Sequence, residues 1–267
     1  PTMTVGPGSR VGVGRRGGGR AGRASGARGT RGSGGGGAGQ KAGAIVVFGG
    51  VRQGPRIGAR GHARSAACTA SLVKSVAVGM LEADVNRGTI AAVIRFMADN
   101  SHFFLNFTMA GVKATMDAAH GIPYSTVVTA ISRNGVDCML RVSGLGDVWP
   151  VVPGARMDEA LYYTGFSLAD AAGDIGDSAI IETCGLGGMA LAAAPSMAVF
   201  VGGSLAGEIA AVKELQTITI ASHPRFTLPT MGFERTPLGI DLRKVVETRI
   251  APFITTGVLH ETSATVG

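Results

Sequence analysis

Acidic residues are missing from the first 81 positions of the sequence, which hold 13 Lys or Arg residues and no Asp or Glu. From Glu82 onward the balance reverses, with 12 basic and 18 acidic residues. The net charge of +7 is therefore a property of the front of the chain. The later part shows no basic footprint for DNA or RNA, and we expect no nucleic-acid partner for it.

Cysteines and aromatic residues are also scarce. Cys68, Cys138 and Cys184 lie far apart and form no CxxC motif, so the sequence predicts neither a disulfide framework nor a zinc site and favours a reducing compartment. No metal-ligand spacing is present, and we expect no metal and no cofactor. Aromatics make up 5% of the chain and hydrophobic residues 45%, which predicts a core of mostly aliphatic side chains.

Charged residues are absent from positions 183–207, a run long enough to span a bilayer. The run holds six Gly residues and is interrupted by Pro195, and no basic cluster flanks it. These features favour two short buried helices over a membrane span. The start of the chain shows no apolar core followed by a cleavage site. We therefore expect a cytoplasmic protein with no membrane partner.

Residues 1–40 are of low complexity, with 16 Gly and 7 Arg. Such a segment buries too little apolar surface to offset its ordering entropy, which predicts disorder. An Arg- and Gly-rich RNA-binding tail is one interpretation, although it lacks the Phe or Tyr residues that stack on bases. A non-native extension is the other. We divide the chain into a front, residues 1–60, and a body, residues 61–267.

The first half of the body has clear periodic signals. Apolar residues at helical spacing predict three successive helices, over residues 66–80, 86–100 and 101–119. A β-hairpin follows over 125–132 and 136–142, because Asn134-Gly135 between the two runs is typical of a type I′ turn.

The second half of the body has weaker signals. The predicted elements are a short strand at Leu161–Tyr163, a helix from Ser178 with Asp177 as N-cap, a helix over 205–220, a linker marked by Pro224 and Pro229, and a second hairpin over 240–247 and 253–259. The fold class that follows is α+β, with helices followed by antiparallel hairpins and with Gly- and Ala-rich buried helices.

Four runs occur in the order known from one family: 98–106, 133–137 with 141–147, 173–183 with 185–188, and 236–248. In these runs the chain resembles the YlbE-like family, whose members are similar to one component of the bacterial oxamate carbamoyltransferase complex. The resemblance implies two other subunits as partners. It also implies phosphorolysis of oxalurate to oxamate and carbamoyl phosphate in allantoin breakdown. The resemblance further predicts that the body is truncated at its N-terminal side.

Phosphorolysis needs cations and N–H groups for phosphate, an Arg or helix N-terminus for a carboxylate, and a group that moves a proton. The candidates for substrate binding are Arg141, Ser143, Gly144, Gly146, Asp147, Asn106, Ser178, Arg243 and Thr256. The candidates for catalysis are Glu182, His102 and Asp177.

Each candidate also has a structural interpretation. The segment from Ser143 to Asp147 is read equally as a tight loop, and Asp177 with Ser178 as a helix cap. Glu182 on an apolar helix needs a partner, as an acid/base group or in a buried ion pair. His102 and Asn106 share a helix face that suits a core or cap role.

Arg243 has two interpretations as well. It is predicted to lie on a strand with Asp241 on the same side, as an anion clamp or in an ion pair. For the whole chain, a carbamoyltransferase subunit, a non-catalytic scaffold that completes a partner's active site, and an RNA-binding tail remain open.

Overall fold

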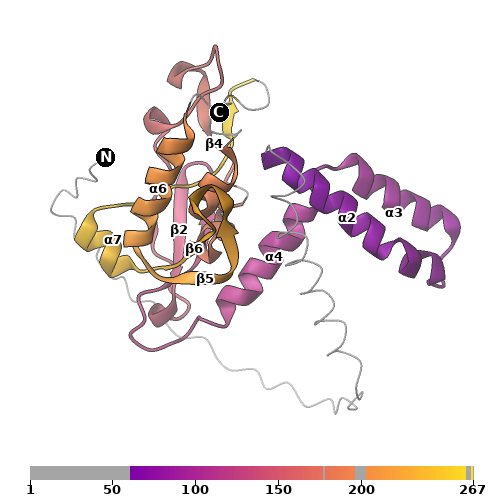
Figure 1. Cartoon of the computed structure of the whole chain (residues 1–267), viewed down its shortest axis with the longest axis horizontal. Coiled ribbons are helices and arrows are strands. Elements are labelled where there is room, and N and C mark those ends of the chain that lie inside the picture. The colour runs from indigo at the N-terminus through magenta and orange to yellow at the C-terminus, as the bar shows by residue number, and fades with distance from the viewer. Residues whose placement is uncertain (1–60, 177, 196–202, 263–265, 267) are drawn as a thin grey trace, which may run out of the picture.

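The computed structural model describes residues 61–176, 178–195, 203–262 and 266 (Figure 1). Within these ranges the chain is α+β, with helices first and small antiparallel sheets after them, which confirms the predicted class. The front of the chain, the proposed cap Asp177 and part of the charge-free run 183–207 lie outside the described residues. None of the helices in the described ranges has both the length and the apolarity that a bilayer crossing requires.

Three consecutive helices confirm the predicted start of the body. They are α2 (Gly61–Glu82), α3 (Arg87–Asp99) and α4 (Phe103–Asp117). Asn86 begins α3 as an N-cap, since its side-chain oxygen accepts the N–H of Thr89 at 2.8 Å. Figure 1 shows α2 and α3 extending away from the strands, with α4 between this helical arm and the rest of the chain.

The predicted first hairpin is present as β1 (Val128–Arg133) and β2 (Asp137–Val142), and β3 (Val151–Pro153) adds a third antiparallel strand. The turn is not of type I′, because only Gly135 of the Asn-Gly pair has positive φ. Asn134 instead accepts the N–H groups of Val136 and Asp137 with its side-chain oxygen. This local capping replaces the second left-handed residue.

The predicted second hairpin is wrong. Asp241 accepts the N–H of Arg243 at 2.9 Å and thereby caps helix α7 (Leu242–Thr248), which occupies the first expected strand. The strand before it is β6 (Glu234–Ile240), which pairs with β5 (Thr219–Leu228). Of the second expected strand only β7 (Val258–His260) forms, and it pairs with β4 (Ala171–Asp174).

Three smaller predictions need correction. The expected linker is instead ordered structure: Pro224 lies in β5, where the register with β6 shifts between Ser222 and Thr227, and Pro229 begins the 3₁₀ helix η6 (Pro229–Met231). Residues 161–163 form no strand; they lie between the 3₁₀ helices η2 (Met157–Glu159) and η3 (Leu168–Asp170). The helix expected from Ser178 is a short 3₁₀ helix, η4 (Ala179–Cys184), which ends at the left-handed Gly185.

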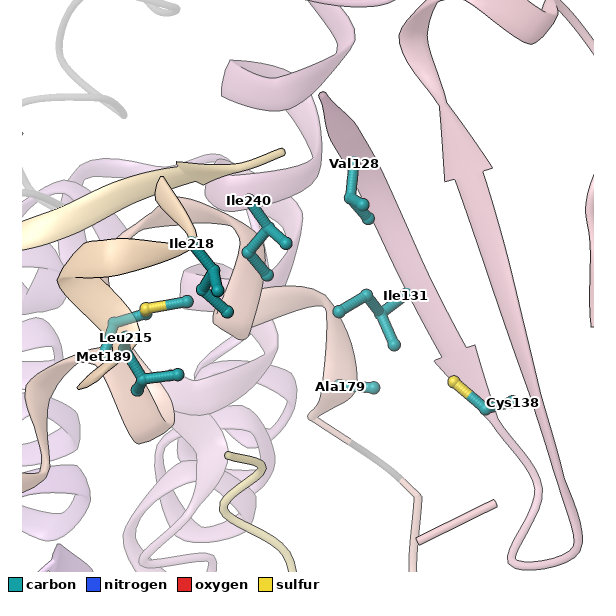
Figure 2. Packing of buried hydrophobic residues seen from close by; sticks show 8 residues of the cluster. All are labelled: Val128, Ile131, Cys138, Ala179, Met189, Leu215, Ile218 and Ile240. Carbon is teal, nitrogen blue, oxygen red and sulfur yellow. The ribbon is translucent and has the colours of Figure 1, made fainter. Parts of the chain in front are cut away.

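The main core lies where β1, β2, η4, α6 (Leu205–Thr217) and β6 meet. A second 3₁₀ helix, η5 (Gly187–Ala193), adds Met189 to it. Figure 2 shows how the side chains of this cluster converge from these elements: Val128, Ile131, Cys138, Ala179, Met189, Leu215, Ile218 and Ile240. The Gly- and Ala-rich segment η5 is largely buried, as predicted, and so is η4 beside it; together they hold the polar groups described next in an apolar surrounding.

Candidate functional site

A large cavity of about 2140 Å³ opens between the helical arm and the strands. Its polar lining includes Ser178 at the start of η4, Gly187 at the start of η5 and Thr255 to Gly257 before β7. His102, beside α4, lies on its wall as well. Elements from three distant parts of the sequence thus enclose one space.

Glu182 lies behind this wall with its side chain fully buried. Its carboxylate accepts the N–H of Gly188 at 2.6 Å, and both the N–H and the hydroxyl of Thr255 at 2.9 Å. Burial raises the pKa of Glu182 to about 7, against the lowering effect of these hydrogen bonds and of the Arg133 charge. The carboxylate therefore ties η5 to the segment before β7 and changes protonation near neutral pH.

Two consecutive glycines, Gly187 and Gly188, leave room for the backbone to pass close to the Glu182 carboxylate. Gly187 has a φ of +58°, and a Cβ atom on it would overlap the Glu182 carboxylate. A Cβ atom on Gly188 would overlap the carbonyl oxygen of Phe253. The backbone can wrap the carboxylate only because both positions lack side chains.

Arg133 and Asp174 form a second buried charged pair, 2.7 Å apart, with side chains 0% and 1% exposed. Within the described residues, neither the guanidinium nor the carboxylate has a partner that meets hydrogen-bond geometry. A pair desolvated in this way depends on mutual attraction to offset its burial. Since the charge of Arg133 also acts on Glu182, we call Arg133, Asp174 and Glu182 the buried charge cluster.

Sequence reasoning did not select Arg133 as a site residue. Arg133 and Asp174 each begin or nearly begin one of the runs that carry the family resemblance. A charged residue at the end of an apolar strand was the signal that could have drawn attention to Arg133. The contact of Thr255 with Glu182 joins positions 73 apart in the sequence, so sequence spacing does not indicate it.

Several sequence candidates meet at the cavity. Ser178 is buried and precedes Glu182 by one turn, and the Thr256 hydroxyl accepts the N–H of Gly176 at 3.4 Å. His102 is exposed on another part of the wall. Asn106 lies outside the lining, and its amide donates to the carbonyl of Phe103 at 3.1 Å. The structure thus groups Ser178, Glu182 and Thr256, and separates Asn106 from them.

Arg141 lies away from the cavity. Its guanidinium donates to the Thr129 hydroxyl at 3.1 Å and to the Asp117 carboxylate, and it lies 5.9 Å from the centre of the Trp149 ring. Asp117 also binds Lys113 on α4. The guanidinium is thereby engaged in an ion pair that joins β2 to α4.

The loop after Arg141 is a tight, hydrogen-bonded loop, which was the structural interpretation of the segment from Ser143 to Asp147. The N–H groups of Ser143 and Gly144 donate to the carbonyls of Val127 and Ser125, at 2.9 and 2.8 Å. The Ser143 hydroxyl donates to a carbonyl at 2.6 Å. Gly146 and Asp147 are exposed and do not line the cavity.

Arg243 is on α7 rather than on a strand, because Asp241 caps the helix. Its side chain is 71% exposed and binds Asp241 at 3.0 Å. Asp241 also accepts the Thr126 hydroxyl at 2.6 Å. The Arg243 hydrogen bond is the main reason that the pKa of Asp241 is lowered to about 2. Over the described ranges, no three His, Cys, Asp or Glu side chains gather as metal ligands would.

Comparison with known proteins places these features in a family. The sequence profile of the family described as "Oxamate carbamoyltransferase subunit AllG" matches residues 38–178. Two proteins of Escherichia coli (strain K12) are similar over most of this chain. "Oxamate carbamoyltransferase subunit AllG" is 40% identical over 78% of this chain and 50% of its own length. "Uncharacterized protein YahG" is 39% identical over 75% of this chain and 42% of its own length.

A solved structure has the same fold. The crystal structure of a conserved protein of unknown function from Enterococcus faecalis V583 superposes with a TM-score of 0.71 and 33% identity, over 84% of this chain and 53% of the other. The chain spans about half the length of the relatives it matches. The expected likeness to an oxamate carbamoyltransferase subunit is found, under the family name AllG rather than YlbE-like.

Proposed function

This chain belongs to the AllG family of oxamate carbamoyltransferase subunits, and from that membership we propose that it works as one subunit of a cytoplasmic carbamoyltransferase complex with two other subunits. The proposed reaction is the phosphorolysis of oxalurate to oxamate and carbamoyl phosphate in allantoin breakdown. The observation that carries the proposal is the family match, and the buried charge cluster beside the large cavity is where we place the site. Perturbed carboxyl groups at a cavity wall are characteristic of functional sites.

In this proposal the wall from Ser178 to Thr256 faces the substrate. The Ser178 hydroxyl and the backbone around Thr256 supply hydrogen bonds to anionic oxygen atoms. Glu182 acts as a positioning residue, because its carboxylate is enclosed by Gly188 and Thr255. It fixes the segment that carries Thr256 to η5.

A non-catalytic scaffold role is the second candidate, and a specific observation favours it. Arg141 and Arg243, the two arginines predicted to bind substrate, form ion pairs with Asp117 and Asp241. A partner subunit would then supply the cations, while this chain completes the shape of the site. His102, on another part of the cavity wall, is the candidate for proton transfer in the first proposal.

One experiment separates the two roles. The chain is co-expressed with its two partner subunits, and carbamoyl phosphate formation from oxalurate and phosphate is measured. Ser178→Ala and Thr256→Val should lower kcat/KM at least about tenfold if the wall contacts substrate, since each removes a hydrogen bond to a charged group. Unchanged turnover in an intact complex favours the scaffold role, and an intact wild-type complex without product contradicts the proposed reaction.

A further inference from the structure

Two arginines lie on the exposed face of the ribbon formed by β5 and β6. Thr227 of β5 pairs with Arg235 of β6, so the side chains of these two residues are on the same face. Arg225 precedes Thr227 by two positions and is therefore a diagonal neighbour of Arg235, at a spacing of about 7–8 Å. All three residues are exposed and line the large cavity. We call Arg225, Thr227 and Arg235 the arginine face.

The opposite face of the same ribbon is buried. Phe226 and Leu228 are 7% and 0% exposed and alternate with the exposed Arg225 and Thr227. Leu228 packs against Val212 of α6 in a hydrophobic cluster. Helix α6, with its acidic residues, thus covers the opposite face of the ribbon, and the arginine face is turned away from it.

His223 fixes the backbone that carries Arg225. Its side chain is buried and stacks on Phe226, with ring centres 4.0 Å apart. Its Nδ1 atom accepts the N–H groups of Arg225 and Phe226 at 3.1 and 3.0 Å. Burial, and after it the charge of Arg225, lowers the pKa of His223 to about 4, so the ring is neutral and accepts both bonds at neutral pH. The backbone of Arg225 is thereby held in place beside the cavity.

Arg235 has no counter-ion within the part of the chain that the structure describes. The carboxylate of its neighbour Glu234 accepts the side-chain amide of Gln216 at 3.4 Å. By contrast, Arg156, another arginine of the cavity lining, forms an ion pair with Asp158. A second positive charge on the same face raises the energy of Arg235 further, and an anion bound between the two charges lowers it.

An aromatic residue, Phe233, precedes Arg235 by two positions and also lines the cavity. Its side chain is 69% exposed, and its φ of +65° is costly for a bulky residue. Its N–H donates to the carbonyl of Leu228 at 3.0 Å, which closes the turn between the two strands. The turn therefore keeps an aromatic ring in the cavity lining close to Arg235, where it offers a flat surface to a planar ligand.

We propose that the arginine face binds an anionic oxygen group of the substrate, either a carboxylate or a phosphate. This inference rests on the proposed function and supplies the cations that Arg141 and Arg243, both engaged in ion pairs, do not supply. A guanidinium binds either group through two parallel hydrogen bonds, and the Thr227 hydroxyl adds a donor. Strand β6 packs on η4 and η5, which joins the ribbon to the wall that begins at Ser178.

Direct binding tests the arginine face without depending on turnover. The 267-residue chain is titrated by calorimetry with oxamate, which carries a planar carboxylate, and separately with inorganic phosphate. Arg235→Gln should weaken the binding of at least one of these anions at least about tenfold, because it removes charge-assisted hydrogen bonds. Arg249→Gln is the matched control. Arg249 is exposed and lines the cavity as well, but it lies at the end of α7, and its replacement should leave binding unchanged.

The complex with the two partner subunits gives the second measurement. There Arg235→Gln should raise a KM at least about tenfold, that for oxalurate if the arginine face binds the carboxylate and that for phosphate if it binds phosphate. An active complex in which neither KM rises overturns the proposal, and so does an equal effect of Arg235→Gln and Arg249→Gln. A wild-type chain that binds neither anion, alone or in the complex, overturns it too. Binding that depends on Arg235 in a complex that forms no carbamoyl phosphate supports the arginine face and contradicts only the proposed reaction.

Discussion

Thr255 gives the Glu182 carboxylate two hydrogen bonds, one from its backbone N–H and one from its hydroxyl, both at 2.9 Å. Because Thr255 lines the cavity and Glu182 does not, this contact transmits the state of a buried carboxyl group to the cavity wall. The first two predictions follow from it.

Stability should fall as pH rises from about 4.5 to about 7. Burial raises the pKa of Glu182 to about 7, so in this window the folded chain holds a proton that the unfolded chain has released. The free energy of unfolding therefore decreases as the pH rises, by about 3 kcal/mol over the whole window. Once the pH is above the folded-state pKa, Glu182 contributes no further change. Urea unfolding at pH 5 and pH 8 measures this. Glu182→Gln should flatten the pH dependence, and parallel curves for the two proteins would contradict the assignment.

Thr255→Val should destabilise the fold by about 1.5–3 kcal/mol at pH 8, because it removes a hydroxyl donor from an ionised carboxylate. Thr255→Ser retains the hydroxyl and serves as the matched control. Denaturation midpoints of the two variants, measured at pH 8 and again at pH 5, report the difference. Equal stability of the Val and Ser variants at pH 8 would mean that the hydroxyl contact is without consequence.

Arg133→Met should cost about 3–5 kcal/mol, because it leaves the Asp174 carboxylate buried without its counter-ion. Adding Asp174→Leu should recover much of that loss, since an apolar pair can replace a buried ion pair. Arg156→Met is the control, because Arg156 forms its ion pair with Asp158 on the surface and should leave the midpoint unchanged. Additive losses in the double variant, measured by urea unfolding, would count against direct coupling of the pair.

Arg141→Gln should lower the melting temperature by about 3–6 °C, because it breaks the link between β2 and α4. The KM for phosphate in the assembled complex should stay the same, since the guanidinium is engaged by Asp117 and Thr129. Calorimetry and steady-state kinetics on the same preparation measure both quantities. A rise in the KM for phosphate without a change in melting temperature would restore Arg141 as an anion clamp.

The sequence predicted the parts of the fold that depend on local signals. Asn86 at a helix start and Asn134-Gly135 between two β-rich runs act through neighbouring backbone groups, so their elements were found. The prediction of a second hairpin was wrong because the apolar residues of 242–248 suit a strand and a helix equally. The hydrogen bond from the N–H of Arg243 to Asp241 begins a helix there, and the sequence pattern does not reveal this contact. Of the predicted site residues, Ser178, Glu182 and Thr256 lie in one region of the structure. The partners of Arg141 and Arg133 come from segments that sequence spacing does not connect.

The two glycines that wrap Glu182 restrict which sequences can build this wall. From Glu182 to Gly188 the chain reads Glu, four intervening residues, then Gly-Gly. Any larger residue at either glycine would displace the carboxylate or the Phe253 carbonyl, so the spacing and the carboxylate must be inherited together. We therefore expect the Glu-x₄-Gly-Gly pattern to mark relatives that build the same wall of the cavity, and we expect a relative with a larger residue at either glycine to lack this contact.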